Sequence, residues 1–217
     1  MASIHETAYP RFKPYFTEKE LDEVFALSSD EIAFLNKKTK ATNMVSRLGF
    51  AILLKCYQYL GRPVNVNNIN VSVKKYIAKQ LSIDSDINLT RYPKSTFKNH
   101  KKSVRDYLEI VQDRKKRRII MKKAALESAQ TKENLADIIN RMIEEIFRQR
   151  CELPAYQSLV RLARAARTVT NHGHYHKISN ALSQKQKRLI DRILESNDDK
   201  LENEWTWFGL KQEPKSP

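Results

Sequence analysis

Residues 43–62 read NMVSRLGFAILLKCYQYLGR, and this stretch decides the fold. On a helix, its apolar side chains would occupy nearly the whole circumference, and a helix without a polar side belongs in the middle of a bundle. These apolar positions are Met44, Val45, Leu48, Phe50, Ile52, Leu53, Leu54, Cys56, Tyr57 and Leu60. Asn43 is predicted to start the helix, and Gly61 with Pro63 to end it. Gly49 inside it costs about 1 kcal/mol relative to alanine, which indicates a close helix crossing.

Helical signals continue on both sides of this stretch. Thr17 with Glu20, and Ser28 with Glu31, have the spacing of capping boxes and predict two short helices before it. Before them, residues 1–16 carry aromatic side chains and two prolines, which is typical of an extended arm laid over a helical body. Further helices are predicted at residues 71–82, 94–111, 133–150, 155–169 and 174–182, and after Ser183. In the second of these, Ser95 is expected to be the cap, and the helix is expected to run to about Val111. Hairpin signals and sustained period-two alternation are missing, so the fold class is predicted to be all-α.

The periodic segments group into two helical units, each a helix-turn-helix-like bundle of three to five helices with a basic face, joined by a basic linker. The predicted division is an N-terminal domain over residues 1–112, a basic linker or helix over 113–130, and a second domain over 131–196. Residues 197–217 form a tail, acidic at first and then aromatic, directed toward a carboxy-terminal region. The sequence does not decide whether 113–123 is a linker or the start of a helix.

Gly173 is interpreted as a turn between the helices Ala155–Val169 and His174–Leu182. That pair has helix-turn-helix proportions, although many helix pairs are joined by a glycine turn. In the last helix, Ser183 is expected to cap the start, and four apolar side chains are expected to pack. They are Leu189, Ile190, Ile193 and Leu194.

Positive charge is concentrated in one segment. The chain has a formal net charge of +15, and residues 91–123 hold thirteen Lys or Arg against three acids. At 100° per residue, Lys94, Lys98, Lys101 and Arg105 fall within roughly 60° of one another, with Lys102 beside them. The neighbouring arc is apolar, so one face can pack while the other presents cations to a polyanion. The alternative is a solvated charged face, but residues 94–105 contain no acid.

Other classes of protein fit less well. The longest apolar run, residues 48–57, is interrupted by Lys55 and is too short to span a bilayer. The first ten residues lack the basic region and apolar core of a signal peptide. Cys56 and Cys151 make no disulfide framework and are expected to be reduced. We therefore expect no membrane association and a cytoplasmic protein.

The sequence offers few candidates for catalysis or metal binding. No phosphate-binding loop, nucleophile elbow, dinucleotide fingerprint or paired-cysteine zinc spacing occurs. His172, His174 and His176 form a cluster, but Gly173 argues for a turn there, and no Cys or acid lies near enough to complete a site. The chain is therefore predicted to have no catalytic residue, no metal site and no cofactor.

Several segments resemble the replicative class II bacterial transposases, the "Tn-three" family. The stretch Asn43–Arg62 is similar to the amino-terminal signature of that family, and the later segments follow in the same order over about residues 10–210. The first block is carried by Arg47, Leu48, Gly49, Phe50, Ala51, Leu60 and Gly61; the second by Arg91, Tyr92, Thr96, His100, Val104 and Arg105; the third by Glu152, Leu153, Pro154, Leu159, Arg164 and Arg167.

The resemblance implies a pair of helical domains that recognise terminal inverted repeats, while catalysis in that family comes from a carboxy-terminal RNase-H-like domain. It therefore implies DNA end recognition without the chemistry, in either a piece or a truncated natural product. The implied partner is double-stranded DNA at transposon ends, and the further candidates are the carboxy-terminal catalytic region and a second transposase copy. The implied location is the bacterial nucleoid.

The DNA-contacting residues themselves are predicted from helical geometry. In the first unit they are Arg91, Lys94, Ser95, Lys98, Asn99, Lys101, Lys102 and Arg105, and in the second they are Arg161, Arg164, Arg167, His174 and Lys177. In the first unit, Asn99 or an arginine would contact bases, while phosphates would be contacted by Lys94, Lys98, Lys101, Lys102 and Arg105. The second set would do the same for the second unit. The alternatives are a non-specific DNA- or RNA-binding architectural protein, a basic scaffold for acidic protein partners, and a metal-dependent nuclease.

Overall fold

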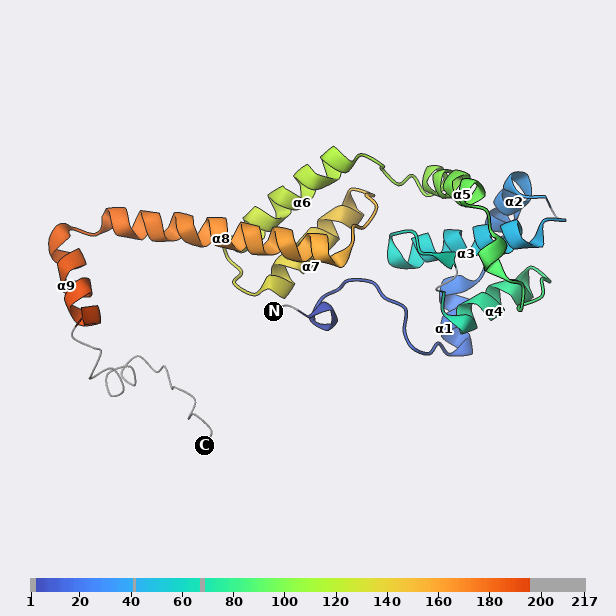
Figure 1. The fold of residues 1–217 in the computed structure, drawn as a ribbon, viewed down its shortest axis with the longest axis horizontal. Helices are drawn as coiled ribbons and strands as arrows, with labels where there is room; N and C mark the ends of the chain where they lie inside the picture. The colour runs from blue at the N-terminus through green and yellow to red at the C-terminus, as the bar shows by residue number, and fades with distance from the viewer. Residues whose placement is uncertain (1–2, 41, 67–68, 196–217) are drawn as a thin grey trace, which may run out of the picture. The chain divides into compact units, whose positions relative to one another are not determined.

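The computed structural model describes residues 3–40, 42–66 and 69–195. Two compact units are distinguished, residues 1–167 and 168–217, and each is described by itself. Within the described ranges the regular structure is helical, with no strand and one isolated β-bridge, between Val111 and Cys151. The predicted all-α class is confirmed (Figure 1).

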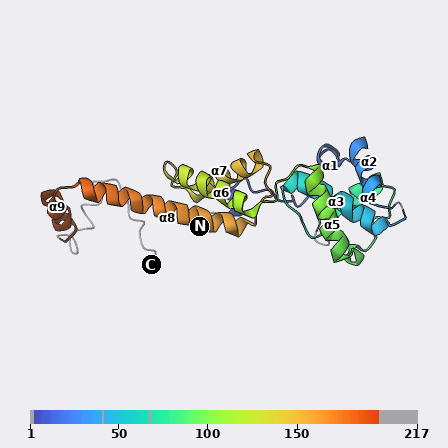
Figure 2. The same ribbon diagram turned by 90° about the horizontal axis from the view of Figure 1, so that it is seen from above.

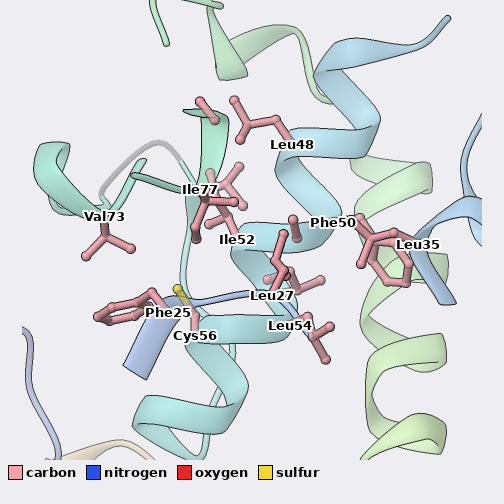
Figure 3. Packing of buried hydrophobic residues seen from close by; sticks show 14 of the residues in the cluster. Phe25, Leu27, Leu35, Leu48, Phe50, Ile52, Leu54, Cys56, Val73 and Ile77 are labelled. Carbon is pink, nitrogen blue, oxygen red and sulfur yellow. The ribbon is translucent and has the colours of Figure 1, made fainter. Parts of the chain in front are cut away.

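The first unit contains a core built around α3, Met44–Leu60, as its apolar circumference predicted. Four helices surround it: α1 (Glu18–Phe25), α2 (Ser29–Lys38), α4 (Val71–Gln80) and α5 (Lys94–Tyr107). Figure 3 shows Phe50, Ile52 and Leu54 of α3 among side chains from the neighbouring helices, and all three are fully buried. Figures 1 and 2 show α5 crossing α3.

Local sequence signals set the ends of these helices. Both predicted capping boxes form, with Thr17 accepting from the Glu20 N–H and Ser28 accepting from the Glu31 N–H. The Asn43 side chain accepts from the Ser46 N–H and starts α3. Gly61 ends α3 with φ of 65°, a left-handed conformation that glycine adopts without strain.

Gly49 lies where α3 meets Tyr92, a residue of the loop before α5. A Cβ atom at Gly49 would lie 2.9 Å from Cε1 of the Tyr92 ring. The predicted close helix crossing at Gly49 is not what the structure has, because the neighbour of Gly49 is the aromatic ring of Tyr92, carried by that loop rather than by a helix.

A second core in the same unit joins α6 (Arg114–Ala129), α7 (Leu135–Arg148) and the first part of α8 (Tyr156–Ala181). The buried stripe on α7 includes Ile138, Ile139, Met142 and Ile146, as its period predicted. The segment that the sequence left undecided is thus helical, and the Asp113 side chain caps α6 by accepting from the Lys115 and Lys116 N–H groups.

The N-terminal arm reaches both cores. Tyr9 is buried in the second core, where its hydroxyl donates to the Pro154 carbonyl oxygen at 2.9 Å. Farther along the arm, Phe12 and Phe16 pack against Phe25 and Tyr59 in the first core. The prediction of an arm laid over a helical body is confirmed.

The bounds of α5 correct two expectations. Ser95 does not cap this helix, because α5 begins at Lys94 with Pro93 as N-cap, and the fixed φ of proline suits that position. The helix ends at Tyr107 rather than near Val111, because Glu109 adopts a φ of 55°, which is outside the right-handed helical region.

The turn predicted at Gly173 is wrong, because α8 runs through this residue to Ala181. A glycine inside a helix costs only about 1 kcal/mol, which the flanking helical residues outweigh. With no turn between 169 and 174, the predicted pair of helices is one helix.

The described part of the second unit, residues 168–195, comprises the rest of α8 and α9, Gln184–Glu195. At the start of α9, the Ser183 N–H donates to the Gln186 side-chain oxygen, and the Gln186 N–H donates to the Ser183 hydroxyl oxygen. The predicted cap at Ser183 is confirmed. The expected packing of Leu189, Ile190 and Ile193 is wrong, since these residues are 55%, 42% and 53% exposed. The side chain of Leu194, the fourth residue of that prediction, lies outside the described part of the chain. The predicted tail, residues 197–217, lies outside the described residues. Of the described helices, none combines the length and apolar character needed to cross a bilayer.

Candidate nucleic-acid interface

The exposed face of α5 carries the first cluster of predicted contacts. Lys94, Lys98 and Lys102 are exposed at successive turns, with Ser95 and Asn99 exposed beside them. The opposite side of the helix packs on α3 through Val104 and His100, both buried. The structure therefore places five of the predicted residues together on one solvent-facing surface, which we call the α5 face.

The α5 face is rotated from the predicted one by roughly 70° at 3.6 residues per turn. Lys101 is half-buried, and Arg105 is buried with 7% of its surface exposed. The Arg105 guanidinium forms an ion pair with the Glu152 carboxylate at 3.3 Å. Arg105 is thus occupied inside the protein, and we do not keep it among the phosphate contacts.

His100 and Tyr92 hold α5 in place from its buried side. The Tyr92 hydroxyl bonds to Nδ1 of His100, whose ring lies 4.4 Å from the Phe50 ring centroid. Burial raises the pKa of Tyr92 and lowers the pKa of His100. A protonated hydroxyl next to a neutral imidazole fits this bond, and the pair fixes which side of α5 faces solvent. Arg91, just before this segment, is exposed at the end of the short helix Leu89–Arg91.

Helix α6 adds a second basic surface that the predicted site residues did not include. Its exposed cations are Arg114, Lys115, Lys116, Arg118, Lys122 and Lys123. Glu127 is the single acid within α6, and it pairs with Lys123 at 3.9 Å. The charge run in residues 114–123 was the available signal, but without a known helix its faces could not be assigned.

The part of α8 in the first unit carries the next predicted contacts. Arg161 and Arg164 are exposed, while Leu159, Val160, Ala163 and Ala166 on the other side are buried in the second core. Arg167 is half-buried, and its guanidinium donates to the Glu133 carbonyl oxygen at 3.4 Å. Arg161 and Arg164 are therefore available to a ligand, whereas Arg167 is engaged with the start of α7.

In the second unit, His174 and Lys177 are exposed on the later part of α8. His172 and His176 lie one turn apart, with ring centroids separated by 4.6 Å. Among the residues that the structure describes, no group of three or more His, Cys, Asp or Glu side chains is arranged to hold a metal ion.

Over the described residues the fold is all-helical, and α5, α6 and α8 each carry exposed lysines or arginines. The family model described as "Domain of unknown function (DUF4158)" matches residues 1–166, and the chain belongs to this family. It is also 26% identical over 200 residues to the transposase for transposon Tn1546 of Enterococcus faecium. That alignment covers 91% of this chain and 20% of the relative, so the chain spans about a fifth of the relative's length.

These matches confirm the resemblance to the amino-terminal region of the "Tn-three" family transposases. They also connect the chain with transposition, in the general sense that its relative is a transposase.

Proposed function

We propose that this chain binds double-stranded DNA and recognises the terminal inverted repeats of a transposon, without supplying catalytic groups. The observation that carries the proposal is the α5 face, where three lysines at successive turns flank an exposed Asn99 and Ser95. The similarity to a transposase supports DNA as the ligand, because a transposase acts on DNA.

The α5 face has the composition that a DNA-reading helix needs. The major groove of B-DNA, about 12 Å wide, admits a helix. Lysines along the edge of such a helix contact phosphates and fix its register, whereas an asparagine makes paired hydrogen bonds with adenine. We assign Lys94, Lys98 and Lys102 to phosphates, and Asn99 to a base edge.

The remaining basic surfaces extend the contact. The exposed cations of α6, together with Arg161 and Arg164 of α8, would neutralise further phosphates along a longer site. Arg91, His174 and Lys177 are exposed and stay in the proposal. Lys101 and Arg167 stay as peripheral contacts because they are half-buried. We also keep the prediction that the chain has two separately folded DNA-binding domains, divided at residue 112.

The test is fluorescence anisotropy with the whole chain and two duplexes, one carrying the terminal repeat of its own transposon and one with that sequence scrambled. Each titration is repeated at several salt concentrations. A preference of about a thousandfold or more for the repeat supports end recognition. Equal affinities with a steep salt dependence would indicate a non-specific nucleic-acid-binding protein instead. No binding to either duplex would indicate a scaffold that binds other proteins.

A charge-matched pair of variants localises the contact. Lys98→Ala with Lys102→Ala removes two cations from the α5 face, while Lys19→Ala with Lys75→Ala removes two exposed cations from α1 and α4. Figure 1 shows α1 and α4 on the other side of α3 from α5. We expect the first pair to weaken binding and the second to leave it nearly unchanged. Equal effects would show that net charge, not the α5 face, governs affinity.

A further inference from the structure

Glu152, in the loop between α7 and α8, is contacted from three helices. Its carboxylate oxygen Oε2 accepts from the Tyr57 hydroxyl of α3 at 2.8 Å and from the Arg105 guanidinium of α5 at 3.3 Å. Its backbone carbonyl oxygen accepts from the Arg117 guanidinium of α6 at 2.9 Å. One residue therefore connects the basic helices α5 and α6 with the central helix α3.

The backbone around Glu152 strengthens this connection. The Leu153 N–H donates to the Gly61 carbonyl oxygen at the end of α3, and the Val111 N–H, between α5 and α6, donates to the Arg150 carbonyl oxygen, both at 2.8 Å. The residue Gly61 also makes room for the Phe147 ring, whose Cε1 would lie 2.4 Å from an added Cβ.

Few other groups near Arg105 could replace the negative charge of Glu152. The Arg105 side chain is 8% exposed and the Glu152 side chain 19%, so their attraction is only weakly screened by water. The Gln112 amide oxygen, oriented as its surroundings require, also accepts from Arg105 but carries no charge. Burial raises the pKa of Tyr57, and Glu152 beside it raises the pKa further, so the hydroxyl keeps the proton that it donates.

We propose that Glu152 is a positioning residue that holds α5 and α6 in one fixed register, and that this register produces the preference for one DNA sequence. The proposal rests on the proposed function. Non-specific binding depends on how many phosphates are neutralised, and this number stays the same if α5 and α6 shift relative to each other. Base readout requires donors and acceptors to meet their groove positions together, so it is lost when the register loosens.

The test compares Glu152→Gln with Glu144→Gln in the whole chain. Both remove one negative charge, but Glu144 is exposed on α7 and pairs only with the neighbouring Arg141 in the described contacts. For Glu152→Gln we expect the ratio of specific to non-specific affinity to fall by about tenfold or more, the scale of one mismatched base pair. Its non-specific affinity should match that of Glu144→Gln, and Glu144→Gln should keep the wild-type ratio.

A distance measurement without DNA tests the positioning directly. Spin labels are attached at Asp106→Cys on α5 and Glu127→Cys on α6, both exposed. The native Cys56 and Cys151 are buried, and burial raises the pKa of Cys56 to about 12, so labelling favours the introduced thiols. The distance distribution should be narrow in the parent protein and broader with Glu152→Gln.

The outcomes separate the two proposals. A broader distribution with a reduced affinity ratio supports the role of Glu152, whereas an unchanged distribution, or a broader one with an unchanged ratio, overturns it. If the parent protein prefers no sequence, the proposed function fails, and the sequence-preference part of this inference fails with it, while the distances still decide the positioning. If Glu152→Gln does not fold, Tyr57→Phe removes one donor to the same oxygen and should give a smaller change in the same direction.

Discussion

Lys98 and Arg105 lie two turns apart on α5, yet Lys98 is exposed while Arg105 is buried against Glu152. The two residues have the same sign of charge and nearly the same angular position on a helical projection. The difference arises because Glu152, which is 47 residues farther along the chain, supplies a partner for Arg105 alone. The two positions should therefore respond differently to the same substitution.

Lys98→Ala should weaken binding to every duplex alike and lower the slope of log affinity against log salt by about one, because one phosphate contact is lost. The melting temperature should be unchanged, since the side chain is exposed. Anisotropy titrations at several salt concentrations, with thermal unfolding, measure both. An unchanged salt slope would remove Lys98 from the interface.

Arg105→Ala should instead reduce stability by about 3 kcal/mol, because it leaves the partly buried Glu152 without its counter-ion. Urea unfolding measures the free energy, and Lys102→Ala on the same helix is the control, with little expected loss. If the two variants were equally stable, the ion pair with Glu152 would contribute little.

Two glycine substitutions should change stability in opposite directions. Gly49→Ala places a Cβ 2.9 Å from the buried Tyr92 ring, which cannot move freely because its hydroxyl bonds to His100. We expect a loss of about 1–3 kcal/mol from overpacking, in spite of the better helix propensity of alanine.

At Gly173 an added Cβ would have nothing within 4 Å, so Gly173→Ala should stabilise α8 locally by up to about 1 kcal/mol.

Helical content and thermal unfolding distinguish these outcomes. A gain from Gly49→Ala would show that the Tyr92 ring relaxes easily. A loss from Gly173→Ala would indicate that the helix bends at that residue.

In the buried pair of Glu31 and Lys55, removal of one partner should cost more stability than removal of the other. The Lys55 ammonium donates to both carboxylate oxygens of Glu31, at 3.3 and 3.1 Å, while Gln58 and the Ser28 N–H donate to the same carboxylate. Glu31→Ala leaves the Lys55 cation buried without a partner and should cost about 3–5 kcal/mol. Lys55→Met leaves Glu31 with two other donors and should cost clearly less. Urea unfolding of both variants measures the difference, and equal costs would contradict this explanation.

The sequence predicted the central helix, the two capping boxes and the start of α9, because each is coded by neighbouring residues. The apolar circumference of residues 44–60 was enough to place α3 inside a bundle, but Gly49 did not reveal that its neighbour is the ring of a loop residue, Tyr92, rather than a crossing helix. The turn at Gly173 was wrong because glycine is a weak breaker, and its effect depends on the helix around it.

The candidate site was predicted only in part. The period of α5 identified a basic side, but the side that faces solvent depends on what His100 and Arg105 contact in three dimensions. Their partners Phe50, Tyr92 and Glu152 lie in other segments, and pairings between distant segments cannot be derived from one sequence. The exposed stripe on α9 was mistaken for core for a similar reason, since amphipathic spacing does not show whether a partner helix is present.

The buried His100 should make stability depend on pH near neutrality. Burial lowers the pKa of His100 below its ordinary value of about 6.5, so the folded chain binds a proton at this imidazole less readily than the unfolded chain does. As the pH falls through about 6.5, the unfolded chain takes up more proton at this position than the folded chain, so the free energy of unfolding falls with the pH.

Glutamine at this position offers the Tyr92 hydroxyl an acceptor but does not titrate. Between pH 7.5 and 5.5, the free energy of unfolding, measured with urea, should therefore fall more for the wild type than for His100→Gln. The other four histidines are common to both proteins and cancel in the comparison. The carboxyl of Glu31 does not interfere: burial raises its pKa, but the bonds from Ser28, Gln58 and Lys55 outweigh burial and lower it overall, so its contribution is lost only in more acidic solution. Equal losses in the two proteins would show that burial does not lower the pKa of His100, because both states would then bind protons equally at this position.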